Sequence, residues 1–192
     1  MKIENDSYYI RYEADNCEDE YASITHFIDV WDNGYRLDTY GFCPNRMNFE
    51  AACWNGVTPD DKDEGKRIDK QLYCKWEKMV IDCKNNIIEK ADKSSSKLGE
   101  VHVGDYLYFT RKDKPLYWLL HITGINESSI KGATIYFDRY DIINHPEPEH
   151  IEQYGIIDQS RLITKEVFDY ASELILKTTT EIMAEIKKRI RN

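Results

Sequence analysis

The stretch that most limits the fold of this chain is VHVGDYLYFT, residues 101–110. Neighbouring side chains of a strand point to opposite faces, so Tyr106 and Tyr108 share one face while Leu107 and Phe109 share the other. Both faces are therefore apolar, whereas a strand of a surface hairpin alternates apolar with polar residues. The run at 116–125 has the same character. A sheet that contains these strands must be covered on both sides.

The pattern predicts an α+β fold in which a strongly curved antiparallel sheet or small barrel packs against two amphipathic helices. Short polar loops separate three strand candidates and favour antiparallel pairing between them. The candidates are residues 101–110, 116–125 and 133–138, within a sheet expected over 98–142, and the helices are 66–92 and 164–190. Gly104 and Asp105 suit a bend before the first of these strands.

The two helices are predicted from apolar residues that recur three and four positions apart. In the first helix this stripe includes Trp76 and Val80, which we expect to be buried. The second helix follows Thr164, a favourable N-cap residue, and ends in KKRIRN. The four cations of that ending suit the negative end of a helix dipole.

The first part of the chain predicts an opening strand at 7–14 and leaves residues 16–41 open. A helix there would carry apolar residues on one face and stop at Gly34, whereas a hairpin would turn at Asn33-Gly34. The β-branched content favours the hairpin. Pro44 and Gly56 then bound a predicted short helix at 44–56.

The bulk composition predicts one domain spanning residues 1–192, with a mixed strand and helix half at 1–97 and a barrel-like half at 98–192. A hydrophobic content of 41% argues against disorder, and the sequence shows no internal repeat. The N-terminal residues do not resemble a signal peptide, so we expect a cytoplasmic protein without membrane contact.

The sequence contains none of the common catalytic or cofactor-binding motifs, so an enzyme is the least favoured class and no cofactor is expected. His145 and His150 flank PEPE, but the prolines extend this segment and spread the side chains, so no metal site is predicted. The five cysteines form no C-x-x-C pair and are expected to be free thiols.

The motif Val103-Gly104-Asp105 before an aromatic strand, followed by HITGI at 121–125, resembles the PUA-like superfamily, which includes the PUA, ASCH and EVE domains. The resemblance covers roughly residues 98–176. It implies a small barrel that binds RNA or a flipped, often modified, nucleobase in a pocket with aromatic walls.

We therefore expect a non-enzymatic binding module for a nucleobase or short nucleic acid. The candidate ligand-binding residues, chosen by residue type and position, are Trp31, Trp54, Tyr108 and Trp118, with Arg139 as a phosphate or base partner. The net charge of −9 supports an alternative, an acidic protein that binds a basic protein partner, as an immunity protein or antitoxin does. Its acidic stretches are Glu18–Glu20 and Asp60–Glu64.

Overall fold

The computed structural model describes residues 3–14, 20–57, 65–111, 116–127, 129–152 and 159–192. These residues form strands and two long helices, so the α+β class is confirmed. In chain order the elements are β1 (Ser7–Ala14), β2 (Glu20–Trp31), β3 (Gly34–Cys43), β4 (Arg46–Asn55), β5 (Lys66–Ile68), α1 (Lys70–Ser94), β6 (Ser96–Lys97), β7 (Tyr106–Arg111), β8 (Leu116–Ile125), β9 (Ser129–Phe137), β10 (Asp141–Glu152), β11 (Arg161–Ile163) and α3 (Lys165–Arg191).

The chain divides into two structural units, and the division falls within both helices. The first unit consists of Met1–Ile81 and Lys177–Asn192, and the second unit consists of Asp82–Leu176. Each unit therefore contains the first part of one helix and the last part of the other.

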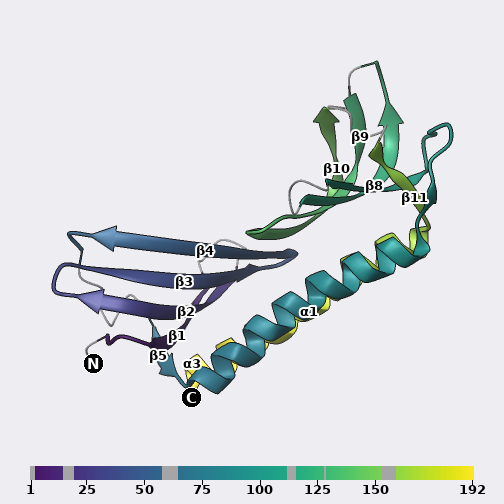
Figure 1. Cartoon of the computed structure of the whole chain (residues 1–192). Helices are drawn as coiled ribbons and strands as arrows, with labels where there is room; N and C mark the ends of the chain where they lie inside the picture. Colours follow the sequence, from purple (N-terminus) through teal and green to yellow (C-terminus); the bar gives the residue numbers. More distant parts are fainter. Residues whose placement is uncertain (1–2, 15–19, 58–64, 112–115, 128, 153–158) are drawn as a thin grey trace. The chain divides into compact units, whose positions relative to one another are not determined.

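In the first unit the strand order is β5-β1-β2-β3-β4, and every pair is antiparallel. The first part of α1 packs on this sheet, because the rings of Tyr73 and Tyr8 lie 5.1 Å apart and Tyr40 Oη donates to Glu77 Oε1 at 3.3 Å. Figure 1 shows the long strands β2, β3 and β4 lying side by side.

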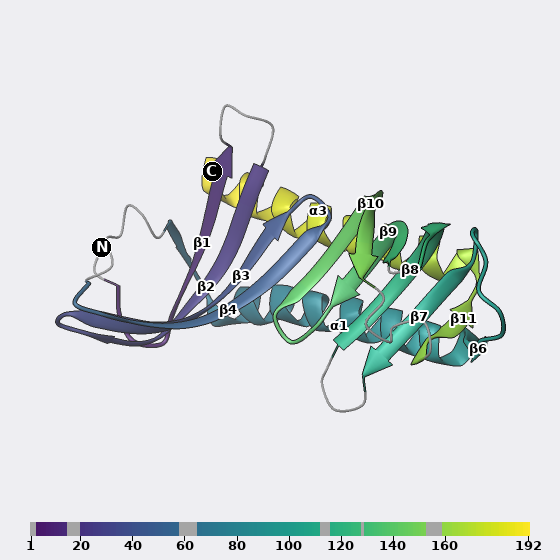
Figure 2. The same ribbon diagram turned by 90° about the horizontal axis from the view of Figure 1, so that it is seen from above.

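In the second unit the strand order is β10-β9-β8-β7-β11-β6, again with antiparallel pairs throughout. The first part of α3 packs on this sheet through the rings of Phe168 and Tyr106, 5.6 Å apart. Asn144 Nδ2 also donates to Ser172 Oγ at 2.8 Å. Figure 2 shows β7 to β10 as neighbouring arrows.

The two units repeat one arrangement of strands, helix and aromatic side chains. In each unit four long strands run in succession, and then a short strand pairs with the first of them and leads into a long helix. A tyrosine of the first strand stacks on a histidine of the second, with ring centroids 4.4 Å apart in both Tyr8–His26 and Tyr106–His121. An aromatic residue of the helix, Tyr73 or Phe168, contacts both rings.

The repeat also has a constant spacing along the chain from the second strand onward. His26 and His121 are 95 positions apart (121 minus 26), and so are the members of the other equivalent pairs, such as Phe42 and Phe137 or Ile68 and Ile163. Even the bulge recurs, after Phe27 in β2 and after Ile122 in β8. The expectation of no internal repeat is wrong for the structure. The sequence does not reveal the repeat because equivalent positions share their strand pairing and burial but few residue identities.

The central strands of the second unit are buried on both faces, as their sequence predicted. Tyr108 and Leu119 are fully buried, and so are Leu107 and Leu120 on the other face. The second face is covered without closing the sheet, because Leu98 and Val101 pack against it together with Ile151 of β10. The predicted strong curvature or small barrel is therefore wrong: among the described strands neither unit's sheet is closed, since the ends of each strand order do not pair with each other.

The hairpin in residues 16–41 is confirmed within the described range, with β2 and β3 joined at Asp32-Asn33. The short helix at 44–56 is wrong, because these residues lie mainly in β4 and pair with β3 over ten positions. Asn45 adopts a φ of 62°, so Pro44-Asn45 forms a tight turn between strands where a helix start was expected.

Both long helices are confirmed. Trp76 has no exposed surface, and Val80 is buried with 7% of its surface exposed. The first helix begins at Lys70 and not at residue 66, because residues 66–68 extend to pair with β1.

Candidate anion-binding site

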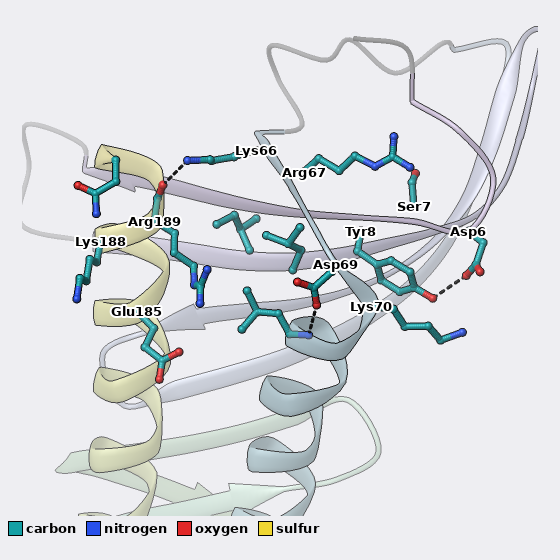
Figure 3. Close-up of a pocket in the computed structure, with 14 residues that line it drawn as sticks. Asp6, Ser7, Tyr8, Lys66, Arg67, Asp69, Lys70, Glu185, Lys188 and Arg189 are labelled. Atoms are coloured by element: carbon teal, nitrogen blue, oxygen red, sulfur yellow. Dashed lines mark hydrogen bonds between the residues drawn. The ribbon is translucent and has the colours of Figure 1, made fainter.

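The first unit contains a hollow of about 1130 Å³ bounded by β1, β5, the start of α1 and the end of α3 (Figure 3). Three apolar residues, Ile10, Ile68 and Leu72, form part of its wall. Five lining residues are cationic and three are acidic; we call this the cationic hollow. The cations are Lys66, Arg67, Lys70, Lys188 and Arg189, and the acids are Asp6, Asp69 and Glu185.

The local sequence KRIDK positions the upper part of the hollow. Lys66 and Ile68 pair with Ile10 and Tyr8 of β1, and Asp69 then caps α1 by accepting a hydrogen bond from the Leu72 backbone N–H at 2.8 Å. Such a cap satisfies one of the free N–H groups at a helix start. Strand and helix follow each other without a loop, so the cations of β5 lie next to the start of α1.

The cations of β5 meet the end of α3. Lys66 Nζ donates to the backbone carbonyl of Arg189 at 2.7 Å, a contact that suits the negative end of the helix. Figure 3 shows the Arg189 side chain extending from α3 into the hollow, whereas Lys188 lies on another side of the helix. Arg67 Nη1 lies 3.3 Å from Glu4 Oε2, with both side chains largely exposed.

One corner of the hollow is acidic. Tyr8 Oη donates to Asp6 Oδ1 at 2.6 Å, and His26 Nε2 lies 2.9 Å from the same oxygen. The Tyr8 hydroxyl, followed by His26, lowers the pKa of Asp6, and burial raises the pKa of Tyr8. Hydrogen bonding to Tyr8 raises the pKa of Lys70, which therefore stays charged.

Glu185 has its hydrogen-bond partners on α1. Its carboxylate accepts from Lys75 Nζ at 2.7 Å and from Trp76 Nε1 at 3.2 Å, and the contact with Lys75 lowers the pKa of Glu185. Asp69 is occupied by its helix cap. All three carboxylates thus have partners within the protein, and the cations that line the hollow favour an anion there.

The structure brings two of the sequence-predicted binding residues together in the first unit. Trp31 ends β2 and Trp54 lies near the end of β4, and they are 37% and 50% exposed. Both adjoin Gly34, where an added Cβ would come within 2.6 Å of Trp31 Nε1 and 2.3 Å of the Trp54 carbonyl oxygen. Neither lines the cationic hollow.

The other three predicted residues, all in the second unit, do not share one surface. Tyr108 is fully buried and faces opposite to Trp118, because Tyr108 pairs with Leu119 and Trp118 pairs with Phe109. Arg139 is exposed in the turn between β9 and β10, with its guanidinium 5.5 Å from the ring of Tyr140. The acidic stretch Asp60–Glu64 of the alternative hypothesis lies outside the described residues. Of the stretch Glu18–Glu20, only Glu20 is described; it begins β2 and forms an ion pair with Lys187.

Sequence reasoning missed the residues of the cationic hollow. The signal was present as two basic groups. KRIDK at 66–70 falls at the start of the first predicted helix, and KKRIRN at 187–192 is explained by the negative end of the second helix. Only the packing of the end of α3 beside the start of α1 within the first unit brings the groups together.

No family model matches the chain, and no curated protein or solved structure matches it. The resemblance to the PUA-like superfamily therefore rests on the quoted motifs alone. Among the described helices none has both the length and the apolar character that crossing a membrane requires.

Proposed function

We propose that this protein is a non-enzymatic binding module that holds a phosphate-bearing ligand of the nucleotide class, free or at the end of a short nucleic acid, in the cationic hollow. The observation that carries the proposal is the gathering of five cations around one hollow in a chain whose net charge is −9. Local charge of this kind attracts anions and concentrates them at the site.

The hollow also has the size and the mixed wall that such a ligand needs. Its volume of about 1130 Å³ lies slightly above the usual range of small-molecule sites, about 300–1,000 Å³. Lys66 and Arg189 would bind phosphate oxygens, while Ile10, Ile68 and Leu72 offer apolar surface to a sugar or base. Arginine and lysine are both common phosphate ligands.

The test is calorimetric titration of the whole chain, at low ionic strength, with a 5′-phosphorylated single-stranded tetranucleotide. We expect a dissociation constant below about 100 μM, which is the weak limit of ordinary non-specific binding. The same tetranucleotide without its 5′-phosphate should bind more weakly. Binding should also weaken as salt is added, because released counterions contribute to it.

A charge-matched pair of variants assigns the binding to the hollow. The double variant Lys66→Gln/Arg189→Gln should lower the affinity by at least about tenfold, the loss expected for one or two charged hydrogen bonds. The control Lys131→Gln/Lys177→Gln removes the same charge from exposed positions outside the hollow and should change the affinity by less than about threefold. Equal losses in both variants, or no binding by the unmodified chain, would reject the proposal.

A further inference from the structure

The second unit has a place that corresponds to the cationic hollow, beside β7, β11 and the start of α3. Ile10 and Lys66 pair across β1 and β5 as Tyr108 and Arg161 pair across β7 and β11. Lys66 and Arg161 are thus equivalent residues of the two short strands. Lysine also begins both helices, as Lys70 and as Lys165.

In the second unit the chain itself neutralises this cation. Arg161 Nη2 lies 2.6 Å from Asp92 Oδ1 near the end of α1, and the guanidinium lies 4.9 Å from the centroid of the Tyr108 ring. β6 then covers the outer edge of β11, with Lys97 paired to Arg161. A carboxylate, a ring and a strand therefore close this end of the second unit.

The first unit replaces the carboxylate and the ring by residues that leave the place open. The helix position equivalent to Asp92, at the same spacing of 95 (187 minus 92), is Lys187, a second cation. Lys187 turns to Glu20, with which it forms an ion pair, and Ile10 stands where the second unit has Tyr108. The contact given by Lys66 Nζ is to a backbone carbonyl, where Arg161 has a carboxylate.

We infer that the second unit displays, in Asp92, the position that the anionic group of the ligand takes against Lys66 in the first unit. The inference rests on the proposed function and specifies it. The Asp92 oxygen that contacts Arg161 stands for a non-bridging phosphate oxygen. Each chain binds one such ligand because the second unit is closed by its own carboxylate. The anion approaches Lys66 from the side of residue 187, near the end of α3.

The test gives the first unit its own carboxylate. Lys187→Asp reproduces the residue of the second unit, and Lys187→Asn is its matched neutral control, because both variants lose the ion pair with Glu20. Both are titrated with the 5′-phosphorylated tetranucleotide. A second pair, Lys66→Arg/Lys187→Asp against Lys66→Arg/Lys187→Asn, reproduces the Arg161–Asp92 pair residue for residue. Circular dichroism melting confirms that each variant is folded.

We expect the unmodified chain to bind one tetranucleotide, the Asn variants to bind it within about threefold of their Lys187 parents, and the Asp variants to lose at least about tenfold in affinity. Equal affinities of the Asp and Asn variants, with binding by the unmodified chain intact, would overturn the inference and leave the proposed function standing. A stoichiometry of two would also overturn it. Absence of binding by the unmodified chain would remove the proposed function, and the inference with it.

Discussion

The two units share their strands, register and stacked Tyr–His pair, yet they differ at the end of the sheet where each helix begins. In the second unit Arg161 has Asp92, Tyr108 and β6 around it. In the first unit the equivalent place is the cationic hollow. The repeated framework therefore depends on pairing and burial, while the chemistry of each copy depends on a few residues at the sheet end.

The difference extends into the core. The helix position that carries Trp76 in the first unit carries Ala171 in the second, at the spacing of 95 (171 minus 76), and neither side chain has exposed surface. Arg189 lies 6.0 Å from the Trp76 ring, and Trp76 Nε1 donates to Glu185. The first unit therefore has a large ring at a buried helix position where the second unit has only a methyl group.

The largest expected effect is that of Trp76→Ala, which makes this position identical in the two units. We expect the free energy of unfolding to fall by about 3–5 kcal/mol, because the cavity adds to the lost burial of the indole. Urea unfolding followed by circular dichroism measures it. A loss below about 1 kcal/mol would show that the first unit does not depend on this ring.

A smaller effect is expected at Gly132, which is equivalent to Leu37 of the first unit (132 minus 37 is 95). An added Cβ at Gly132 would lie 2.3 Å from the His121 carbonyl oxygen, so the backbone would have to shift. We expect Gly132→Ala to cost about 1–3 kcal/mol in the free energy of unfolding. Leu37→Val, at the equivalent position of the first unit, is the matched control. An unchanged urea midpoint for Gly132→Ala would mean that the backbones of β8 and β9 can move apart at this point without a cost in free energy.

The sequence predicted those parts of the fold that depend on local pattern. Apolar spacing located α1 and α3, and Asn33-Gly34 located the hairpin of β2 and β3. The both-sided burial of β7 and β8 also followed, but the barrel did not, because covering a second face with Leu98, Val101 and Ile151 looks the same in sequence as covering it by closure.

The candidate site could not be predicted in the same way. The cations of β5 and of the end of α3 are more than a hundred positions apart, and only the second group has a local explanation, in the negative end of the helix dipole. The repeat was hidden for a similar reason. Strand register constrains burial more than identity, so Tyr73 and Phe168, or Trp76 and Ala171, occupy equivalent positions with different residues.

The helix caps allow a further comparison of about 1 kcal/mol. The Asp69 carboxylate accepts a hydrogen bond from the Leu72 N–H, whereas the backbone carbonyl of Thr164 accepts from the Val167 N–H. We expect Asp69→Ala to lower the free energy of unfolding by about 0.5–2 kcal/mol, the usual cost of a lost cap. Asp69→Asn should restore most of this loss in urea unfolding; equal losses in both variants would point to the charge and not to the cap.

The smallest expected effect concerns Asp6, whose equivalent two residues before the stacked tyrosine of the second unit is Gly104. The Tyr8 hydroxyl and His26 lower the pKa of Asp6 below its ordinary 3.8. A carboxyl whose pKa falls on folding stabilises the fold while ionised, so its contribution is complete above about pH 4 and is lost as the pH falls through the lowered pKa. The melting temperature of the unmodified chain should therefore exceed that of Asp6→Asn by a small margin at pH 6, and the margin should narrow at pH 3.

Asp105→Asn, in the turn that precedes the stacked tyrosine of the second unit, is the control for a general loss of negative charge. A margin for Asp6→Asn that stays constant between pH 6 and pH 3 would show that the first unit gains nothing from this carboxylate beyond what the second unit achieves with glycine.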